Sequence, residues 1–284
     1  LENNLYCQFV TEDTFTYKDS LKWSVSNIGL QIFCKLGGIP WLVKPAKQDC
    51  LVFGIGSAHE KVDGKIKKYS AYTVCLDSTG RFNYIKPLSS SQDEKGYLSE
   101  FKKNLQEILR SDVAQYYQTV VVHVPYKIRK KEIEAIQNAV EDSEISQKHE
   151  FILVRINTEH SFMGFSEHNT RIPLESTLLK LSNREYLIWA EGLQDEKKVL
   201  HKRTASPLYV DFMYQPKSWD SKKEALQDIL NLTGANWRGF NSRSQPISIY
   251  YSHLIAKFMK EFSHLDGYSD ISIVQAESIA PWFL

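Results

Sequence analysis

The stretch LVFGIGSAHE, residues 51–60, decides how the fold of this chain is interpreted. It begins as an apolar, β-rich run and then carries two closely spaced glycines, Gly54 and Gly56. Two further β-rich runs follow at residues 69–77 and 81–87, with a Ser-Thr-Gly turn between them that is a hairpin signal. These three runs predict a meander of strands that opens a β-sheet.

The rest of the chain alternates between helical and β-rich patterns. Apolar residues at three- to four-residue spacing predict helices, and continuous apolar runs predict buried strands. Helices are predicted at residues 19–36, 97–109, 130–140, 221–232 and 248–262, and strands at 119–124, 151–156, 184–190 and 207–213. The polar segment 89–96 shows no periodicity and is predicted to be a loop. This order predicts an α/β fold, a mixed sheet flanked by helices with parallel pairing in its second half.

Composition limits the classes of function. The chain has 284 residues, 42% of them hydrophobic, and a formal net charge of +1, so only a local basic surface would suit nucleic acid. The four cysteines lie far apart without a C-x-x-C pair, which disfavours a zinc site or a disulfide framework and favours buried thiols in a reducing compartment. No membrane span or signal peptide is apparent, so we expect a globular cytoplasmic protein. Because it starts without Met on a strand-like run, we expect the C-terminal part of a longer chain.

Four segments resemble Argonaute proteins in sequence and order: the first resembles the segment that joins the MID domain to PIWI in prokaryotic members, and the other three resemble the PIWI domain. They are CQFVTEDTF (residues 7–15), NIGLQIFCKLGGIPW (27–41), LTGANWRGFNSRSQPISIYYSHLIAKF (232–258) and the apolar tail APWFL (280–284). The resemblance implies an RNase H-like fold and a role in binding guide and target strands. It divides the chain into a lead-in at residues 1–20, the end of a MID-type region or its linker, and a PIWI domain at residues 21–284.

Cleaving members of this family hold two divalent metals with several carboxylates. By the resemblance, these positions fall at Gly56, at Pro125, near Gly96 (where Glu94 is close by) and at Asp211. Glycine and proline have no side chain that binds metal, so at least two ligands are missing. We therefore predict that the chain is not an enzyme and that no catalytic residue remains at Gly56, Pro125 or Asp211.

Two rival hypotheses assign other chemistry to these residues. One is a metal-dependent RNase H-like nuclease with a rearranged site around Asp211, Glu94 and His123; the plainer interpretation is that His123 packs in a strand, His59 caps a strand end and Asp211 is a hydrogen-bonded acid. The other is a nucleotide-binding loop at residues 54–56. That loop needs a third glycine and a following helix, and neither is present.

Three basic clusters are candidates for contact with phosphate. Each is open to a second interpretation as an ordinary solvated surface. The cations at the start of the predicted helix 130–140 oppose the helix dipole, and a phosphate would offset that cost. The candidates are Lys127, Arg129, Lys130 and Lys131; Lys202 and Arg203 beside His201; and Asn236, Arg238, Arg243, Tyr250, Tyr251 and Lys257.

The resemblance places Arg243, Tyr250 and Tyr251 where a PIWI domain meets the 5′ end of the guide. There the C-terminal carboxylate of Leu284 would help to hold a structural Mg²⁺ at the 5′ phosphate. By the same resemblance, the chain is similar to short, inactive prokaryotic Argonautes, which signal target binding to an effector such as a TIR, sirtuin-like or nuclease protein. Defence against plasmids or phages is the implied role, and the guide is RNA or DNA.

Overall fold

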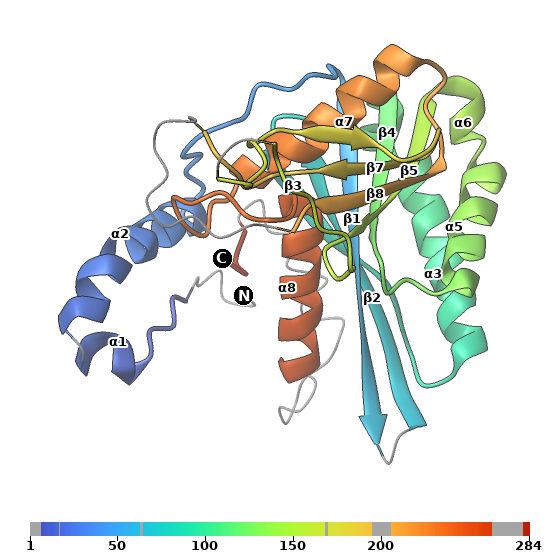
Figure 1. Ribbon diagram of the computed structural model, residues 1–284. Helices are drawn as coiled ribbons and strands as arrows, with labels where there is room; N and C mark the ends of the chain where they lie inside the picture. Colours follow the sequence, from blue (N-terminus) through green and yellow to red (C-terminus); the bar gives the residue numbers. More distant parts are fainter. Residues whose placement is uncertain (1–6, 17, 63–64, 168–169, 195–205, 263–280) are drawn as a thin grey trace.

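The computed structural model describes residues 7–16, 18–62, 65–167, 170–194, 206–262 and 281–284. Its centre is an eight-stranded sheet in the order β3-β2-β1-β4-β5-β8-β7-β6 (Figure 1). The strands are β1 (Cys50–Val62), β2 (Lys65–Asp77), β3 (Phe82–Ser91), β4 (Thr119–Pro125), β5 (Glu150–Asn157), β6 (Leu178–Lys180), β7 (Glu185–Ile188) and β8 (Leu208–Tyr214). The helices are α1 (Glu12–Thr16), α2 (Lys18–Lys35), α3 (Glu94–Arg110), α4 (Asp112–Tyr116), α5 (Lys130–Ser143), α6 (Ile145–Lys148), α7 (Trp219–Gly234) and α8 (Ile247–Phe262). The predicted mixed sheet flanked by helices is confirmed.

The type of strand pairing changes twice across the sheet, from antiparallel to parallel and back to antiparallel. β1, β2 and β3 form the predicted antiparallel meander, β1, β4 and β5 lie parallel, and β8, β7 and β6 are antiparallel to their neighbours. The predicted parallel pairing is therefore correct for β4 and β5 but wrong for β8. A parallel neighbour requires a crossover connection, whereas the chain leaves β5 through the β6–β7 hairpin and returns as β8 between β5 and β7.

Helices cover both faces of the sheet. Because successive side chains of a strand point to opposite faces, β1 contributes to two apolar clusters. Phe53 and Ile55 join the cluster that contains α3 and α5, whereas Val52 joins the cluster that contains α7 and α8. Helix α8 runs alongside β1 (Figure 1). Gly54 and Gly56 lie on the same face of β1 as Val52 and contact α8.

The predicted loop at residues 89–96 is wrong. β3 extends to Ser91 and α3 begins at Glu94. Asp93 is the N-cap of α3, where its Oδ1 accepts a hydrogen bond of 2.7 Å from the backbone N–H of Gly96. The polar composition of the segment therefore marks a strand end followed directly by a helix cap.

The first strand is longer than its apolar run predicts. It continues beyond Gly56 to Val62 and pairs with β2 along its length. His59 consequently lies inside the strand, where its ring centroid is 5.1 Å from that of Tyr69 and 5.9 Å from that of Tyr97. The hypothesis that His59 caps a strand end is wrong. The short elements α1, α4, α6 and β6 were also not predicted, since each has five residues or fewer.

The cysteine prediction is correct for three of four residues. Cys34, Cys50 and Cys75 are buried free thiols, whereas Cys7 is an exposed free thiol. Among the described residues, no helix combines the length and the apolar character that crossing a bilayer requires.

Candidate nucleic-acid interface

The backbone of α8 packs directly against two glycines of β1. A Cβ atom built on Gly54 would lie 2.5 Å from the carbonyl carbon of Ser248, and one built on Gly56 would lie 2.5 Å from that of Ser252. The carbonyl oxygen of each serine would be closer still. Ser248 and Ser252 are one helical turn apart, about 6 Å, which matches the ~6.6 Å between alternate residues of a strand. Strand and helix therefore pack backbone to backbone.

This packing fills the space that a side chain at residue 56 would need. By the resemblance to cleaving Argonautes, this is the space that the first carboxylate of a two-metal site would occupy. An acidic residue at Gly56 would require α8 to move away from β1, because its backbone carbonyl at Ser252 lies where the Cβ atom would be. The first-strand position is therefore closed by backbone as well as lacking an acid.

Pro125 ends β4 and is buried beside Ile156 of β5. A small hollow of about 70 Å³ lies at this end of the two strands. Among the described residues that line it, Glu159 is the only acidic one, and its carboxylate is 2.9 Å from Nζ of Lys127. One exposed, ion-paired carboxylate does not supply the cluster that two divalent metals need.

Asp211 is the carboxylate partner of two arginines. Its oxygens accept hydrogen bonds of 2.7 Å from the guanidinium groups of Arg155 on β5 and Arg184 before β7. Burial opposes ionisation of the Asp211 carboxyl, but the hydrogen bonds and the positive charges of the two arginines together outweigh burial and hold its pKa below the ordinary value. β4 and β5 separate β8 from β1, so Asp211 lies roughly 14 Å from the first strand. The interpretation of Asp211 as a hydrogen-bonded acid is confirmed.

The structure does not bring together the residues of the rearranged nuclease site. Buried His123 faces α8, where its Nδ1 is 2.7 Å from Oγ of Ser248, and burial lowers its pKa to about 3. Glu94 begins α3, on the opposite face of the sheet, and Asp211 lies on β8. No group of three or more potential metal ligands occurs in the part of the chain that the structure describes. That rival hypothesis is wrong in its geometry, and the nucleotide-binding loop is also wrong, because residues 54–56 lie within a paired strand.

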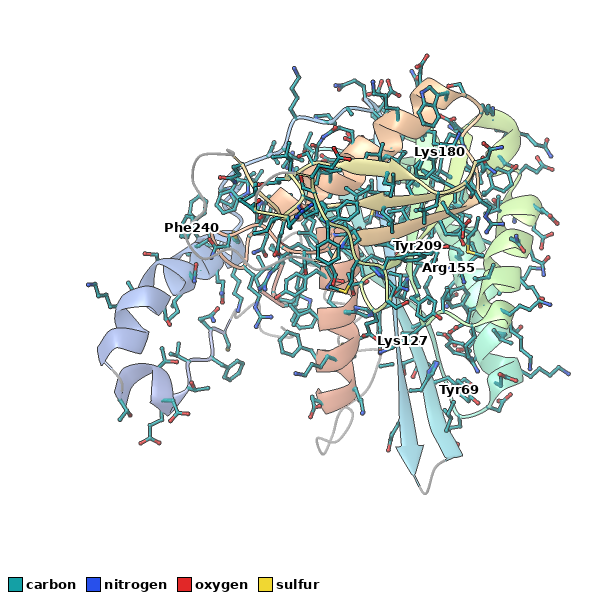
Figure 2. All side chains as sticks on the ribbon, viewed as in Figure 1. Tyr69, Lys127, Arg155, Lys180, Tyr209 and Phe240 are labelled. Carbon is teal, nitrogen blue, oxygen red and sulfur yellow. The ribbon has the colours of Figure 1, made fainter. Side chains whose placement is uncertain are left out.

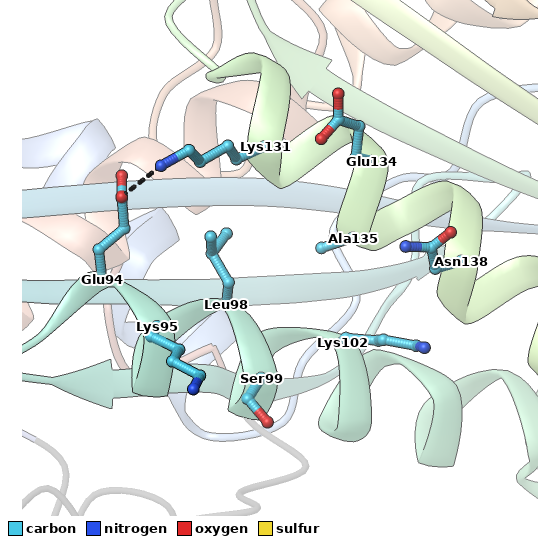
Figure 3. Close-up of a pocket in the computed structure, with 9 residues that line it drawn as sticks. All are labelled: Glu94, Lys95, Leu98, Ser99, Lys102, Lys131, Glu134, Ala135 and Asn138. Carbon is cyan, nitrogen blue, oxygen red and sulfur yellow. Dashed lines mark hydrogen bonds and ion pairs between the residues drawn. The ribbon is translucent and has the colours of Figure 1, made fainter.

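The cations at the start of α5 have protein partners. Glu94 accepts from Arg129 at 2.8 Å and from Lys131 at 2.6 Å, and Lys127 pairs with Glu159. A groove of about 480 Å³ lies between α3 and α5. Figure 3 shows Lys131 of α5 reaching Glu94 of α3. These carboxylates offset the helix-dipole cost that we expected a phosphate to offset, and phosphate contact at this cluster stays a prediction.

A second hollow, of about 330 Å³, brings together two arginines and a polar rim. The hydroxyl oxygen of Tyr250 accepts hydrogen bonds from both arginines, at 2.8 Å from Arg243 and at 3.3 Å from Arg238. The guanidinium group of Arg243 also lies 4.4 Å from the centre of the Tyr250 ring. The lining residues are Gln8, Phe9, Val10, Thr11, Thr14, Ser24, Asn27, Ile28, Gln31, Arg238 and Arg243.

Tyr251 and Asn236, which we also predicted to contact nucleic acid, are buried and support the loop before α8 through hydrogen bonds. The buried hydroxyl of Tyr251 accepts a hydrogen bond of 2.8 Å from the backbone N–H of Trp237, and burial raises the pKa of Tyr251. The buried side chain of Asn236 donates to the carbonyl of Asn241 at 3.0 Å. We correct their predicted roles from nucleic-acid contact to loop support. Lys257 is exposed on α8, and His201, Lys202 and Arg203 lie outside the described residues.

The sequence did not identify the α2 side of this hollow. Gln31 donates to the carbonyl of Arg238 at 2.9 Å. Lys35 is buried and donates to the carbonyl of Cys7 and to Oε1 of Gln8, each at 2.8 Å. Burial, and then the charge of Arg238, lower the pKa of Lys35. Both residues belong to the segment 27–41 that carries the resemblance, but helical periodicity alone places such residues on an ordinary surface.

The predicted Mg²⁺ near Leu284 has no protein site in this hollow. Among the described residues that line it, none is acidic, whereas Mg²⁺ prefers carboxylate oxygens. The lining residues fit an anion and by themselves do not fit a divalent cation. The side chain of Leu284 is buried, and the neighbouring Phe283 ring is 5.1 Å from Tyr251. A metal held by phosphate and the C-terminal carboxylate stays a prediction.

Comparison with known families decides the relationship. The model of the Piwi domain family matches residues 2–264. This chain belongs to the Piwi family. A Piwi protein of Archaeoglobus fulgidus is 28% identical over all of this chain and 70% of its own length. The Argonaute of Cereibacter sphaeroides is 22% identical over 93% of this chain and 37% of its own length.

Solved Argonaute structures share the fold of this Piwi domain. The A. aeolicus Argonaute has a TM-score of 0.68 and 19% identity over 94% of this chain and 36% of its own. The Clostridium butyricum Argonaute, solved with a guide DNA and a 19-mer target DNA, has a TM-score of 0.67 and 19% identity over 90% of this chain and 34% of its own. These likenesses confirm the RNase H-like fold, and this Piwi domain spans about a third of each of those solved chains.

Proposed function

We propose that this Piwi domain binds a guide strand and its complementary target and leaves the target uncut. The single observation that carries this proposal is the contact of Gly56 with the carbonyl of Ser252, which leaves no room for the first metal-binding carboxylate. The buried Pro125 and the arginine-bound Asp211 support it, because neither offers a free carboxylate to a metal.

The hollow around Arg238 and Arg243 is the proposed contact for the 5′ phosphate of the guide. Two guanidinium groups and amide and hydroxyl side chains are donors that suit phosphate oxygens. Within the described residues, the buried Nε of Arg243 has no hydrogen-bond partner, and an anionic oxygen would supply one. The likeness of this Piwi domain to an Argonaute solved with guide and target DNA supports a guided role, in which base pairing supplies sequence specificity.

A domain that binds without cutting needs another protein to act on the bound target. We therefore propose that this Piwi domain signals to an effector, such as a TIR, sirtuin-like or nuclease protein, in prokaryotic defence in the cytoplasm. The guide is RNA or DNA, since phosphate contacts alone do not select the sugar.

Copurification tests the proposal directly. Nucleic acid extracted from the full-length protein should be short, narrow in length and 5′-phosphorylated, and its yield should fall when Arg243 is changed to Ala. Lys103→Ala is the matched control, because Lys103 is an exposed cation on α3, on the other face of the sheet. A full-length protein that carries no guides and binds no 5′-phosphorylated oligonucleotide would contradict guide binding.

Incubation with a guided target tests the absence of cleavage separately. With Mg²⁺ or Mn²⁺ and a fully complementary target, the target should stay intact over hours. Metal-dependent cleavage by the purified protein would contradict this half of the proposal and leave guide binding standing.

A further inference from the structure

The described sheet ends in a short, apolar edge strand. β6, Leu178–Lys180, is the last strand in the sheet order and pairs only with β7 among the described residues. All three of its side chains are exposed. Proteins usually protect such edges with charges, proline or a covering segment, because an open edge is a template for another strand.

The hydrogen bonds to β7 fix which backbone groups point outward. The carbonyl of Thr177 accepts from Trp189, and the N–H of Leu181 donates to Glu185, both at 2.9 Å. In an antiparallel pair, alternate residues bond to the same neighbour, so Thr177, Leu179 and Leu181 face β7. The N–H and C=O groups of Leu178 and Lys180 therefore point away from the sheet.

Apolar side chains continue from this edge across one face of the sheet. Leu179 lies opposite Leu187, and Leu187 lies opposite Tyr209. Tyr209 lies on β8 (Figure 2). The ring of Phe162 stacks on the ring of Tyr209 with centroids 5.5 Å apart, so the loop after β5 covers this face. The next residues of that loop stay open to solvent, with 68% of Met163 and 67% of Phe165 exposed, as is 48% of Leu179.

We propose that the β6 edge binds the β6 edge of a second copy of this chain, in antiparallel pairing about a two-fold axis at Leu179. In this register Leu178 faces Lys180 of the second copy and Lys180 faces Leu178 of the second copy. These are the residues whose backbone groups point outward, so the pairing forms four hydrogen bonds. Leu179 then faces Leu179 of the second copy across the axis.

A second copy fits this edge because the edge is complementary to itself. A two-fold interface uses the same patch on both subunits, and the centre at Leu179 gives every outward group of β6 a partner. Exposed apolar side chains at or beside the edge, Leu178 excepted because it points to the other face, offer roughly 600 Å² per copy, which sets an upper limit on the apolar area this contact can bury against the ~800 Å² per partner of a standard interface. They are Phe162, Met163, Phe165, Leu174, Leu179 and Leu181.

The charges near β6 do not oppose this contact. Lys180 is the only charged residue of the strand, and edge lysines commonly block pairing. Its Nζ instead lies 5.7 Å from the centre of the Trp219 ring, drawn toward α7. With a net charge of +1 per chain, two copies repel each other only weakly.

Opposite charges at the two-fold axis test the pairing and its register. We would measure sedimentation velocity of the full-length protein, freed of nucleic acid, from about 1 to 100 µM. Leu179→Glu and Leu179→Lys should each raise the dimer dissociation constant at least about tenfold, because like charges would face each other. An equimolar mixture of the two variants should associate again, since Glu then faces Lys. Val113→Glu and Val113→Lys on α4 are matched controls at an equally exposed apolar residue and should not change association.

A backbone variant tests the hydrogen bonds independently. Leu178→Pro removes an outward N–H without removing a bond to β7, so the chain should stay folded by circular dichroism and associate at least about tenfold more weakly. A monomeric wild-type protein at all concentrations would overturn the proposal and indicate that another partner covers the edge. A dimer that the Leu179 variants do not weaken, or a mixture that stays monomeric, would overturn it too.

Discussion

Gly56 of β1 and Ser252 of α8 are in contact through their backbones, with no side chain between them. The same relationship joins Gly54 to Ser248 one helical turn away. The glycines therefore have a packing role in this chain beyond the absence of an acid. Placing an aspartate at residue 56 would add a charge at a point where even one carbon atom does not fit.

The first prediction concerns the cost of a Cβ atom at this contact. Gly56→Ala should lower the free energy of unfolding by about 1–3 kcal/mol, because α8 must shift to admit the methyl group. Gly29→Ala is the matched control, since a Cβ on Gly29 of α2 meets no atom within 4 Å, and it should be neutral or raise stability by up to ~1 kcal/mol. Urea denaturation of both variants measures the difference. Equal stabilities for the two variants would contradict backbone packing at Gly56.

The sequence predicted the main elements of the fold because their patterns are local. The apolar run of β1, the meander and the periodic faces of α3, α5, α7 and α8 all appear within windows of a few residues. The antiparallel placement of β8 was missed, because strand direction depends on the path of the β6–β7 hairpin and not on the composition of β8. Residues 89–96 were misread because strand ends and helix caps share polar residues with loops.

The site was predicted only in part, because local sequence shows which residues are present but not how distant segments pack. Missing acids at Gly56 and Pro125 can be read from the sequence, but the closure of the Gly56 position by Ser252 depends on packing between segments almost 200 residues apart. Arg238 and Arg243 were identified, whereas Lys35 was not, because its burial arises only when the segment around Cys7 folds over α2.

The second prediction concerns the hydroxyl of Tyr250. Because this oxygen accepts from both Arg238 and Arg243, Tyr250→Phe should leave the ring contact intact and free the two guanidinium groups to move. Affinity for a 5′-phosphorylated oligonucleotide should fall by about 1 kcal/mol, or roughly fivefold, and Arg243→Ala should cost at least tenfold.

Fluorescence anisotropy with matched 5′-phosphate and 5′-hydroxyl oligonucleotides measures both effects. The losses should be confined to the phosphorylated strand, and Arg243→Ala should reduce the salt dependence of binding by about one phosphate contact. Equal losses of affinity for both oligonucleotides would show that the hollow does not bind the 5′ phosphate.

The third prediction concerns the buried Asp211. Asp211→Asn leaves Arg155 and Arg184 without their anionic partner and should lower the free energy of unfolding at pH 7 by about 3 kcal/mol. The pKa of Asp211 is lowered in the folded state, so its contribution is present above the ordinary pKa of an aspartate and is lost as the pH falls through the folded pKa. Wild type and variant should therefore converge in stability in strong acid, and a constant difference at all pH values would contradict an ionised Asp211.

The fourth prediction concerns His123, which burial keeps neutral in the folded state with a pKa of about 3. Above pH 6.5 the imidazole is neutral in both states, so stability does not depend on it. Below pH 6.5 the unfolded chain binds a proton that the folded chain does not, so the free energy of unfolding should fall by up to ~1.4 kcal/mol per pH unit. His123→Asn keeps a polar partner for Oγ of Ser248 but does not titrate. Urea denaturation between pH 7.5 and about 5 should show a loss in wild type that exceeds that of the variant by about 2 kcal/mol; parallel curves would show that His123 becomes protonated within the folded chain.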